Sequence, residues 1–344
     1  MRNKRNHPYS GCATSAFLGI VLLSCLNVYS QRAAEEDIHY RTAILAVTFS
    51  ADGKLLASTS GWIIGIWSVS RGEKIREIRL PPSDGSIVGV SFSQDGSLLY
   101  GGSADGRLLQ WQVDTGKQLD GLIVKPDASA PSYAFFVQAV AFSHDRTLFA
   151  NGIHTGEVNV WDTHSGKHIA RLSGSHGEIR SLAFSPSDSL LAVGNSNDLI
   201  LVWNLKEHGD PRVLHRDTTQ EPPGWIYAAL FLPDGKTLAS SGFHPGVILW
   251  DVSTAKQSSL IGPSYDWVES IDISADGTYL LTGSKNANDR DPKTHIPRSH
   301  RISLWSVKSA TVLKEFTGAV PAFSPDGQQI AISEGQNITF RPLK

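Results

Sequence analysis

The sequence predicts an all-β fold made of seven copies of one antiparallel unit, and three observations support this prediction. An apolar segment that ends in Phe-Ser, or in a close variant, recurs seven times and is followed by a turn of the Asp-Gly type. A second apolar segment follows each turn, and a third segment ends in Trp six times and in Phe once. The chain of 344 residues also contains 31 glycines, as a fold with many tight turns requires.

The first strand and first turn of each copy can be identified directly. Alternating or continuous apolar character predicts buried strands, and Asp-Gly supplies the positive φ angles of tight hairpins. The seven segments are AVTFSADG (46–53), GVSFSQDG (89–96), AVAFSHDR (139–146), SLAFSPSD (181–188), AALFLPDG (228–235), SIDISADG (270–277) and VPAFSPDG (320–327).

The third strands end at large aromatic residues, which can fill the space between neighbouring units. One unit alone cannot bury both of its faces, so the units are expected to stack side by side. The aromatic residues are Trp67, Trp111, Trp161, Trp203, Trp250, Trp305 and Phe340.

Seven stacked copies of this unit resemble a β-propeller, and the resemblance implies a seven-bladed ring of four-stranded antiparallel blades over residues 31–344, with a fourth strand such as 167–172 in each blade. The copies lie near 43–80, 86–123, 136–173, 178–215, 225–261, 267–316 and 317–344. The seventh copy ends after its third strand, and segment 36–41 precedes the first copy with no other role in the pattern. We expect 36–41 to be the fourth strand of the last blade, because this would join the two termini and remove an exposed sheet edge.

A repeat of about 40–45 residues with a Trp-Asp ending resembles the WD-repeat propeller family, here in a degenerate, bacterial-type form. The dipeptide is present at Trp161-Asp162 and Trp250-Asp251. Many members of the family carry a His before the first strand and an Asp before the third, which form a polar network with a Ser and the Trp. Only His176 and Asp105 occupy these positions, and they belong to different copies. No blade is therefore expected to hold the full network.

The first 30 residues have the order of an export signal. Basic residues at 2–5 precede an uncharged apolar run at 16–26, and Val28 and Ser30 are small residues at the two recognition positions of a leader peptidase that would cleave after Ser30. Alternatively, Leu-Leu-Ser-Cys at 22–25 resembles a lipobox with Cys25 as the lipidation candidate, or the segment stays as an uncleaved anchor. In each case we expect an extracytoplasmic protein that is periplasmic, secreted or lipid-anchored at the cell envelope.

Composition narrows the class of function. The two cysteines, Cys12 and Cys25, both precede residue 31, so the predicted propeller has no disulfide and no Cys-ligated zinc. A formal net charge of −2 and the lack of a basic block disfavour nucleic acid as a partner. We expect a monomer without a cofactor or bound metal, which contacts a membrane only through an N-terminal lipid or anchor.

The resemblance implies that the turns after strands one and three share one face. The loops after strand two and the connections between blades share the other, which we call the long-loop face. The long loops are 80–87, 120–136, 206–226, 262–268 and 284–301. Binding residues tend to lie on variable loops held by a rigid scaffold, so we expect partner proteins to bind this face.

Aromatic and basic residues on these loops are the candidate contacts. Aromatic rings are preferred binding anchors, although they also pack beneath their own loops. The candidates are Trp225, Trp267, Phe136, Tyr227, Tyr265 and Tyr133, with Arg290, Lys293 and Arg298 in the 284–301 insertion. Such a basic loop can bind an acidic partner, or it can extend into solvent without a binding role.

The sequence thus favours a non-catalytic protein-interaction scaffold. The alternative is a propeller enzyme or cofactor-binding protein, similar to lactonases or quinone dehydrogenases, that uses the central channel. Such an enzyme needs acidic or His residues that converge from several blades, whereas the first strands here carry mostly small and apolar residues. Stoichiometric calcium or quinone in the purified protein would favour the enzyme.

Overall fold

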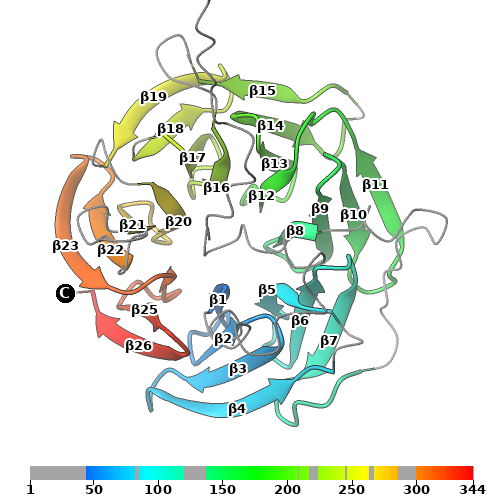
Figure 1. The fold of residues 1–344 in the computed structure, drawn as a ribbon, viewed down its shortest axis with the longest axis vertical. Helices are drawn as coiled ribbons and strands as arrows, with labels where there is room; N and C mark the ends of the chain where they lie inside the picture. Colours follow the sequence, from blue (N-terminus) through cyan, green and yellow to red (C-terminus); the bar gives the residue numbers. More distant parts are fainter. Residues whose placement is uncertain are drawn as a thin grey trace, which may run out of the picture.

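The computed structural model describes residues 44–81, 85–119, 137–207, 209–216, 224–244, 246–262, 267–285 and 300–343. These residues form 26 strands, paired antiparallel in seven sheets, and no helix. Seen down its shortest axis, the protein runs once around a ring, and each sheet begins near the centre and ends at the rim (Figure 1). The predicted seven-bladed β-propeller is confirmed.

We number the blades in sequence order and describe their strands from the ring centre outward. The innermost strands are β1 (Ala46–Phe49), β5 (Ile87–Phe92), β8 (Val137–Phe142), β12 (Ile179–Phe184), β16 (Ile226–Phe231), β20 (Val268–Ile273) and β24 (Pro321–Phe323). The second strands are β2 (Leu55–Thr59), β6 (Leu98–Ser103), β9 (Leu148–Ile153), β13 (Leu190–Asn195), β17 (Thr237–Gly242), β21 (Tyr279–Lys285) and β25 (Gln329–Glu334). The third strands are β3 (Ile63–Ser68), β7 (Leu108–Gln112), β10 (Val158–Asp162), β14 (Leu199–Asn204), β18 (Val247–Asp251), β22 (His300–Ser306) and β26 (Asn337–Pro342). The outermost strands are β4 (Glu73–Arg79), β11 (His168–Leu172), β15 (Arg212–His215), β19 (Lys256–Ile261) and β23 (Thr311–Thr317).

Five of the sheets have the predicted four strands, and two have three among the described residues. In blade 2, an isolated bridge between Trp111 and Gln118 stands in place of the outermost strand, and residues 120–136 lie outside the described residues. Blade 7 ends with β26, and the predicted closing strand at 36–41 also lies outside the described residues.

A hydrogen-bonded turn follows the innermost strand and explains the recurring Ser-x-Asp sequence. In blade 1 the Ser50 hydroxyl donates to the Asp52 carboxylate at 2.7 Å, and the Leu55 N–H donates to the Ser50 hydroxyl oxygen at 3.0 Å. The hydrogen bond from Ser50, with one from the Lys54 backbone, lowers the pKa of Asp52 to about 2. Gly53 then takes a φ of +69°, which favours glycine. The same Ser–Asp bond is present at Ser93, Ser143, Ser274 and Ser324.

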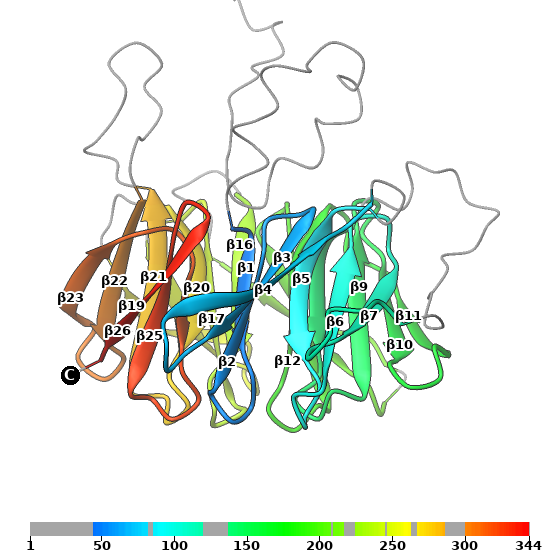
Figure 2. The same cartoon turned by 90° about the horizontal axis from the view of Figure 1, so that it is seen from below.

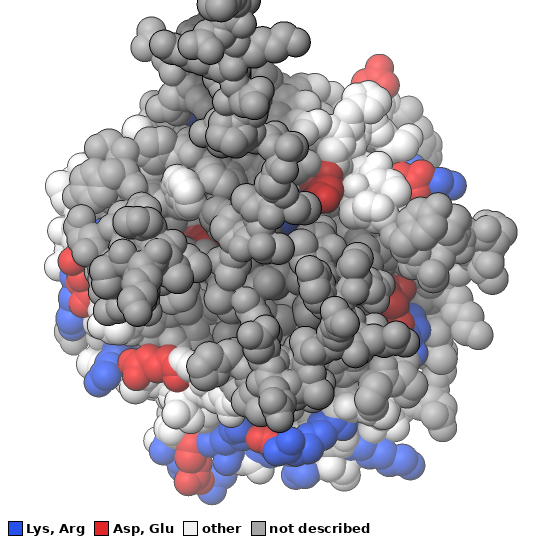
Figure 3. All heavy atoms as spheres, viewed as in Figure 1, with Lys and Arg blue, Asp and Glu red and all other residues white. Residues whose placement is uncertain are grey.

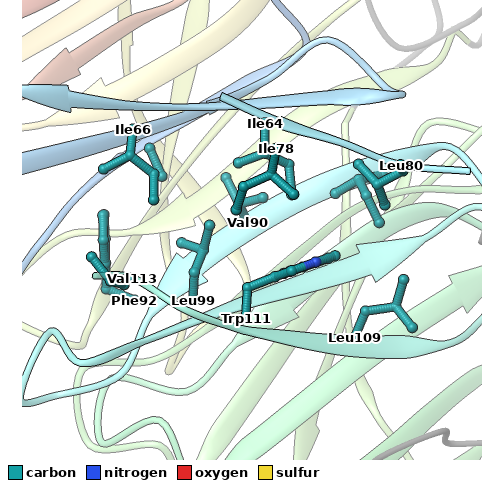
Figure 4. Close-up of a cluster of buried hydrophobic side chains, with 12 residues drawn as sticks. Ile64, Ile66, Ile78, Leu80, Val90, Phe92, Leu99, Leu109, Trp111 and Val113 are labelled. Carbon is teal, nitrogen blue, oxygen red and sulfur yellow. The ribbon is translucent and has the colours of Figure 1, made fainter. Parts of the chain in front are cut away.

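Apolar side chains from facing sheets hold neighbouring blades together, and a separate buried cluster lies at each of the seven interfaces. Between blades 1 and 2, Ile64 and Ile78 lie across the interface from Val90 and Trp111 (Figure 4). The Trp111 side chain is 1% exposed. The third-strand aromatic residue fills the space between blades here, as the sequence predicts.

The ring closes between blades 7 and 1 through backbone and apolar contacts. The Ile44 N–H donates to the Gly335 carbonyl at 3.4 Å, and the rings of Phe49 and Phe340 meet edge to face at 6.3 Å between centroids. Ile338 belongs to the same buried cluster. Blade 7 therefore contacts blade 1 through its turn and its aromatic third strand.

Glycine in the second strand permits close approach of the next blade. A Cβ atom on Gly152 would lie 2.3 Å from Cγ2 of Ile179, and one on Gly194 would lie 2.6 Å from Cγ2 of Ile226. Carbon atoms pack at about 3.5–4.0 Å, so the observed spacing of blades 3, 4 and 5 requires glycine at both positions.

A reduced polar network surrounds the third-strand tryptophans. The indole N–H of Trp67 donates to the Ser58 hydroxyl at 2.9 Å, and equivalent bonds join Trp161, Trp250 and Trp305 to polar side chains of their second strands. His176 is exposed, and Asp105 pairs with Arg107 at 2.8 Å. The His and Asp components of the family network are thus not joined to a Trp in these blades.

Candidate functional site

The antiparallel order of each blade divides its loops between two faces. The turns after the first and third strands lie on one face, and the loops after the second strand and between blades lie on the long-loop face. Figure 2 shows the ring edge-on, with the strands running between the two faces. Every innermost strand begins at the long-loop face, so the residues at these starts surround the ring axis there.

The structure brings together the three predicted aromatic residues that it describes. The rings of Trp225 and Tyr227 lie 6.2 Å apart between centroids, and Phe243 lies 5.4 and 5.5 Å from them. Phe243 also contacts Trp267, at 4.7 Å. We call Trp225, Tyr227, Phe243 and Trp267 the aromatic cluster. Phe243 was not among the residues predicted from the sequence, although its place in a loop of the same face could have indicated it.

The other predicted contact residues cannot be placed in this cluster, because they lie outside the described residues. They are Phe136, Tyr133, Tyr265, Arg290, Lys293 and Arg298, and the lipidation candidate Cys25 lies outside as well.

Exposure varies across the aromatic cluster. Trp267 is 38% exposed, Trp225 and Phe243 are half-buried, and Tyr227 is 3% exposed. Burial raises the pKa of the Tyr227 phenol above its usual value. Trp267 therefore presents part of its ring to solvent while Phe243 supports it, an arrangement typical of aromatic anchors in protein interfaces.

Arg180 on β12 adds a cation beside the aromatic cluster. The guanidinium carbon lies 4.3 Å from the centroid of the Trp225 ring, and Nη2 pairs with the Glu178 carboxylate. Arg180 is 3% exposed, and this burial lowers its pKa. Arg180 was not among the residues predicted from the sequence. Its position four residues before the first-strand Phe, as in Tyr227 one blade later, was the available signal.

The opposite face and the rim carry a different chemistry. The opposite face consists of short turns that include exposed Lys117 and Lys167. In Figure 3, Lys and Arg side chains gather with acidic ones along the rim over β4, at the lower edge. Lys74 pairs there with Glu77 at 2.8 Å. The charges of this rim are thus mixed and partly paired.

Among the described residues, no group of three or more His, Cys, Asp and Glu side chains is placed to hold a metal ion. No helix in the described part of the protein is long and apolar enough to cross a membrane.

The side chain of Asp272 on β20 accepts a hydrogen bond across the interface between blades 6 and 7. The Phe323 N–H of β24 donates to Oδ2 of Asp272 at 2.7 Å. The side chain keeps partial exposure, but its enclosure by protein raises the pKa to about 6. Between about pH 4 and 6, the folded protein holds a proton that the unfolded protein releases. The free energy of unfolding therefore falls as pH rises through this window.

We expect Asp272→Asn to remove this pH dependence, because the amide oxygen can still accept the Phe323 hydrogen bond. Urea unfolding at pH 4.5 and pH 7 is the measurement. The parent should lose about 2 kcal/mol relative to the variant between these pH values. Asp52→Asn is the control: the pKa of Asp52 is lowered, so its effect on stability is lost only below about pH 4. Equal changes in the parent and Asp272→Asn would contradict the assignment.

Comparison with known proteins finds a family model described as WD domain, G-beta repeat, which matches residues 36–68, 73–112, 166–204 and 255–290. The last three ranges each begin at the outermost strand of one blade (β4, β11 or β19) and continue into the inner strands of the next. The matched unit is thus offset by one strand from the structural blade.

Three similar proteins show how much of the sequence is shared. WD repeat and SOCS box-containing protein 1 of Danio rerio is 35% identical over 112 residues, which cover 32% of this chain and 26% of that protein. Apoptotic protease-activating factor 1 of Rattus norvegicus is 25% identical over 76% of this chain and 20% of its own length. Echinoderm microtubule-associated protein-like 2 of Homo sapiens is 26% identical over 70% of this chain and 35% of its own length. The chain thus spans about a third or less of the length of these relatives.

Proposed function

Because the chain is a seven-bladed β-propeller of the WD-repeat type, we propose that it is a non-catalytic scaffold that binds partner proteins through its long-loop face. The aromatic cluster carries this proposal, because it exposes Trp267 on a support of packed rings. Two similar proteins have names that relate them to other proteins, a protease in one case and microtubules in the other. These names support a protein as the class of partner.

Trp267→Ala is expected to weaken partner binding by ~2 kcal/mol or more, as loss of a central aromatic anchor does. The partner is first isolated by affinity capture from the envelope or secreted fraction, and its Kd is then measured by calorimetry with purified components. Trp225→Ala is a second variant, but it also removes the ring under Arg180, so its unfolding must be measured in parallel.

Paired substitution of Lys117 and Lys167 by Ala is the matched control, because both side chains are exposed on the opposite face. The control should leave the Kd unchanged. If only the lysine variant loses binding, the assignment of faces is reversed. If Trp267→Ala binds as the parent does, the aromatic cluster is packing alone and not the contact surface.

We also propose that the scaffold works outside the cytoplasm, on the basis of the apolar run at 16–26 behind a basic start. The mass of the native mature protein tests this. A protein that starts at Gln31 supports secretion, and a diacylated Cys25 supports a lipoprotein. An intact Met1 leaves only the anchor.

A further inference from the structure

A β-bulge recurs at the start of the innermost strand in five blades. In each of these five blades, blades 2 to 6, two residues on the innermost strand oppose one residue on the second strand. A bulge re-aims the extra side chain out of the regular alternation of the strand. The extra residues are Val88, Gln138, Arg180, Tyr227 and Glu269. Because the bulges are equivalent, these residues lie at one level around the ring axis, at the long-loop face.

Four consecutive blades, 3 to 6, place polar side chains in the bulge. The phenol of Tyr227 lies within electrostatic range of Arg180 on one side and of Glu269 on the other. The strands that carry them, β8, β12, β16 and β20, are successive neighbours around the ring centre in Figure 1. We call Gln138, Arg180, Tyr227 and Glu269 the bulge ring.

Three members of the bulge ring are buried with unused hydrogen-bonding atoms. Gln138 is 4% exposed, and Arg180 and Tyr227 are each 3% exposed. Nε and Nη1 of Arg180, both amide atoms of Gln138 and the Tyr227 hydroxyl have no hydrogen-bond partner among the described residues. Buried polar atoms normally have partners, and exceptions concentrate at functional sites.

We propose that the bulge ring binds a carboxylate group, which on the proposed scaffold function belongs to the partner protein. The unused atoms are mainly donors: N–H groups on Arg180 and Gln138 and the O–H of Tyr227. A guanidinium edge matches a carboxylate in a bidentate geometry, and Glu178 and Trp225 already fix the orientation of Arg180. Glu178 and Glu269 are nearby anions, so a singly charged carboxylate fits better than a phosphate dianion.

The Nε–H resonance of Arg180 tests the site directly. The full-length protein is labelled with ¹⁵N-arginine, and the resonance is assigned by its loss in Arg180→Lys. One probe is an N-acetylated, C-terminally amidated tripeptide with a central glutamate. A second is N-acetyl-triglycine with a free C-terminal carboxylate. The controls are the same capped tripeptide with glutamine in place of glutamate, and inorganic phosphate.

A saturable shift with at least one carboxylate probe, and none with the controls, is the expected result. The responding probe shows whether the carboxylate comes from an acidic residue or from the C-terminus of a polypeptide. Equal shifts with the glutamine peptide, a shift with phosphate alone, or no shift with either carboxylate overturns the proposal.

Arg180→Met separates binding from folding. It removes the unused N–H groups and the buried cation, and the Glu178 carboxylate left behind is 34% exposed and can be solvated, so we expect the melting temperature to change little. Carboxylate affinity should fall at least tenfold. Arg171→Met is the control, since Arg171 lies on the exposed outermost strand β11, away from the innermost strands that carry the bulge ring, and pairs there with Glu157. If partner binding needs Trp267 but not Arg180, the carboxylate site is wrong and the scaffold function stands. If Arg180 binds carboxylate while no variant on the long-loop face affects the partner, the carboxylate site stands and the proposed scaffold function is wrong.

Discussion

Trp111→Ala is expected to lower the free energy of unfolding by about 3–5 kcal/mol, the usual loss when a fully buried large aromatic side chain is removed. The Trp111 side chain is 1% exposed between blades 1 and 2 and belongs to a buried cluster with side chains from both blades. Blade 1 cannot move to fill the cavity without also leaving blade 7, because the seven blades form a closed ring. Chemical denaturation of the purified variant gives the difference.

Trp267→Ala is the matched comparison, because it removes the same side chain from a site that is 38% exposed. The stability loss for Trp267 should be less than half of that for Trp111. Similar losses at both sites would show that Trp111 does not have the central packing role that its burial indicates.

The fold could be predicted from the sequence because its main signal is repetition. Seven copies of one pattern place Phe49, Trp67 and their equivalents in register without any knowledge of tertiary contacts. The Ser-x-Asp turns are local and form within five residues, so the sequence contains their whole explanation.

The bulges could not be predicted in the same way. A bulge is a difference in residue count between two paired strands, as between Ile179–Ser181 and Gly194–Asn195, and it becomes visible only when the partner strand is in place. Alternation along β12 alone does not show that Arg180 is an extra residue.

Two members of the aromatic cluster, Trp225 and Trp267, were named from the sequence as candidate contacts because they lie on long loops of the long-loop face. The contacts made by these residues come from other loops and blades. Phe243 follows the second strand of blade 5, and Arg180 belongs to blade 4. No short-range pattern links residues that are about 20 to 45 positions apart in sequence.

The closing strand is the part of the ring that remains a prediction, and the family matches support it. Matches 73–112, 166–204 and 255–290 each begin with the outermost strand of the preceding blade. The first match begins at residue 36, ahead of β1 in blade 1. By the same alignment, 36–41 is expected to take the outermost place of the blade before blade 1. In the closed ring this is blade 7, where three strands are described.

Deletion of 36–41 is therefore expected to cost ~3 kcal/mol or more, because it uncovers β26 and the apolar side chains beneath an outer strand. The melting temperature of the purified variant measures the loss. Moving 36–41 to a position after Lys344, through a short flexible linker, should restore most of the stability, since the strand can then pair with β26 from the other terminus. Deletion of 31–35 is the control and should change little. A 36–41 deletion that melts at the parent temperature, or a relocated strand that restores nothing, would show that blade 7 is closed in some other way.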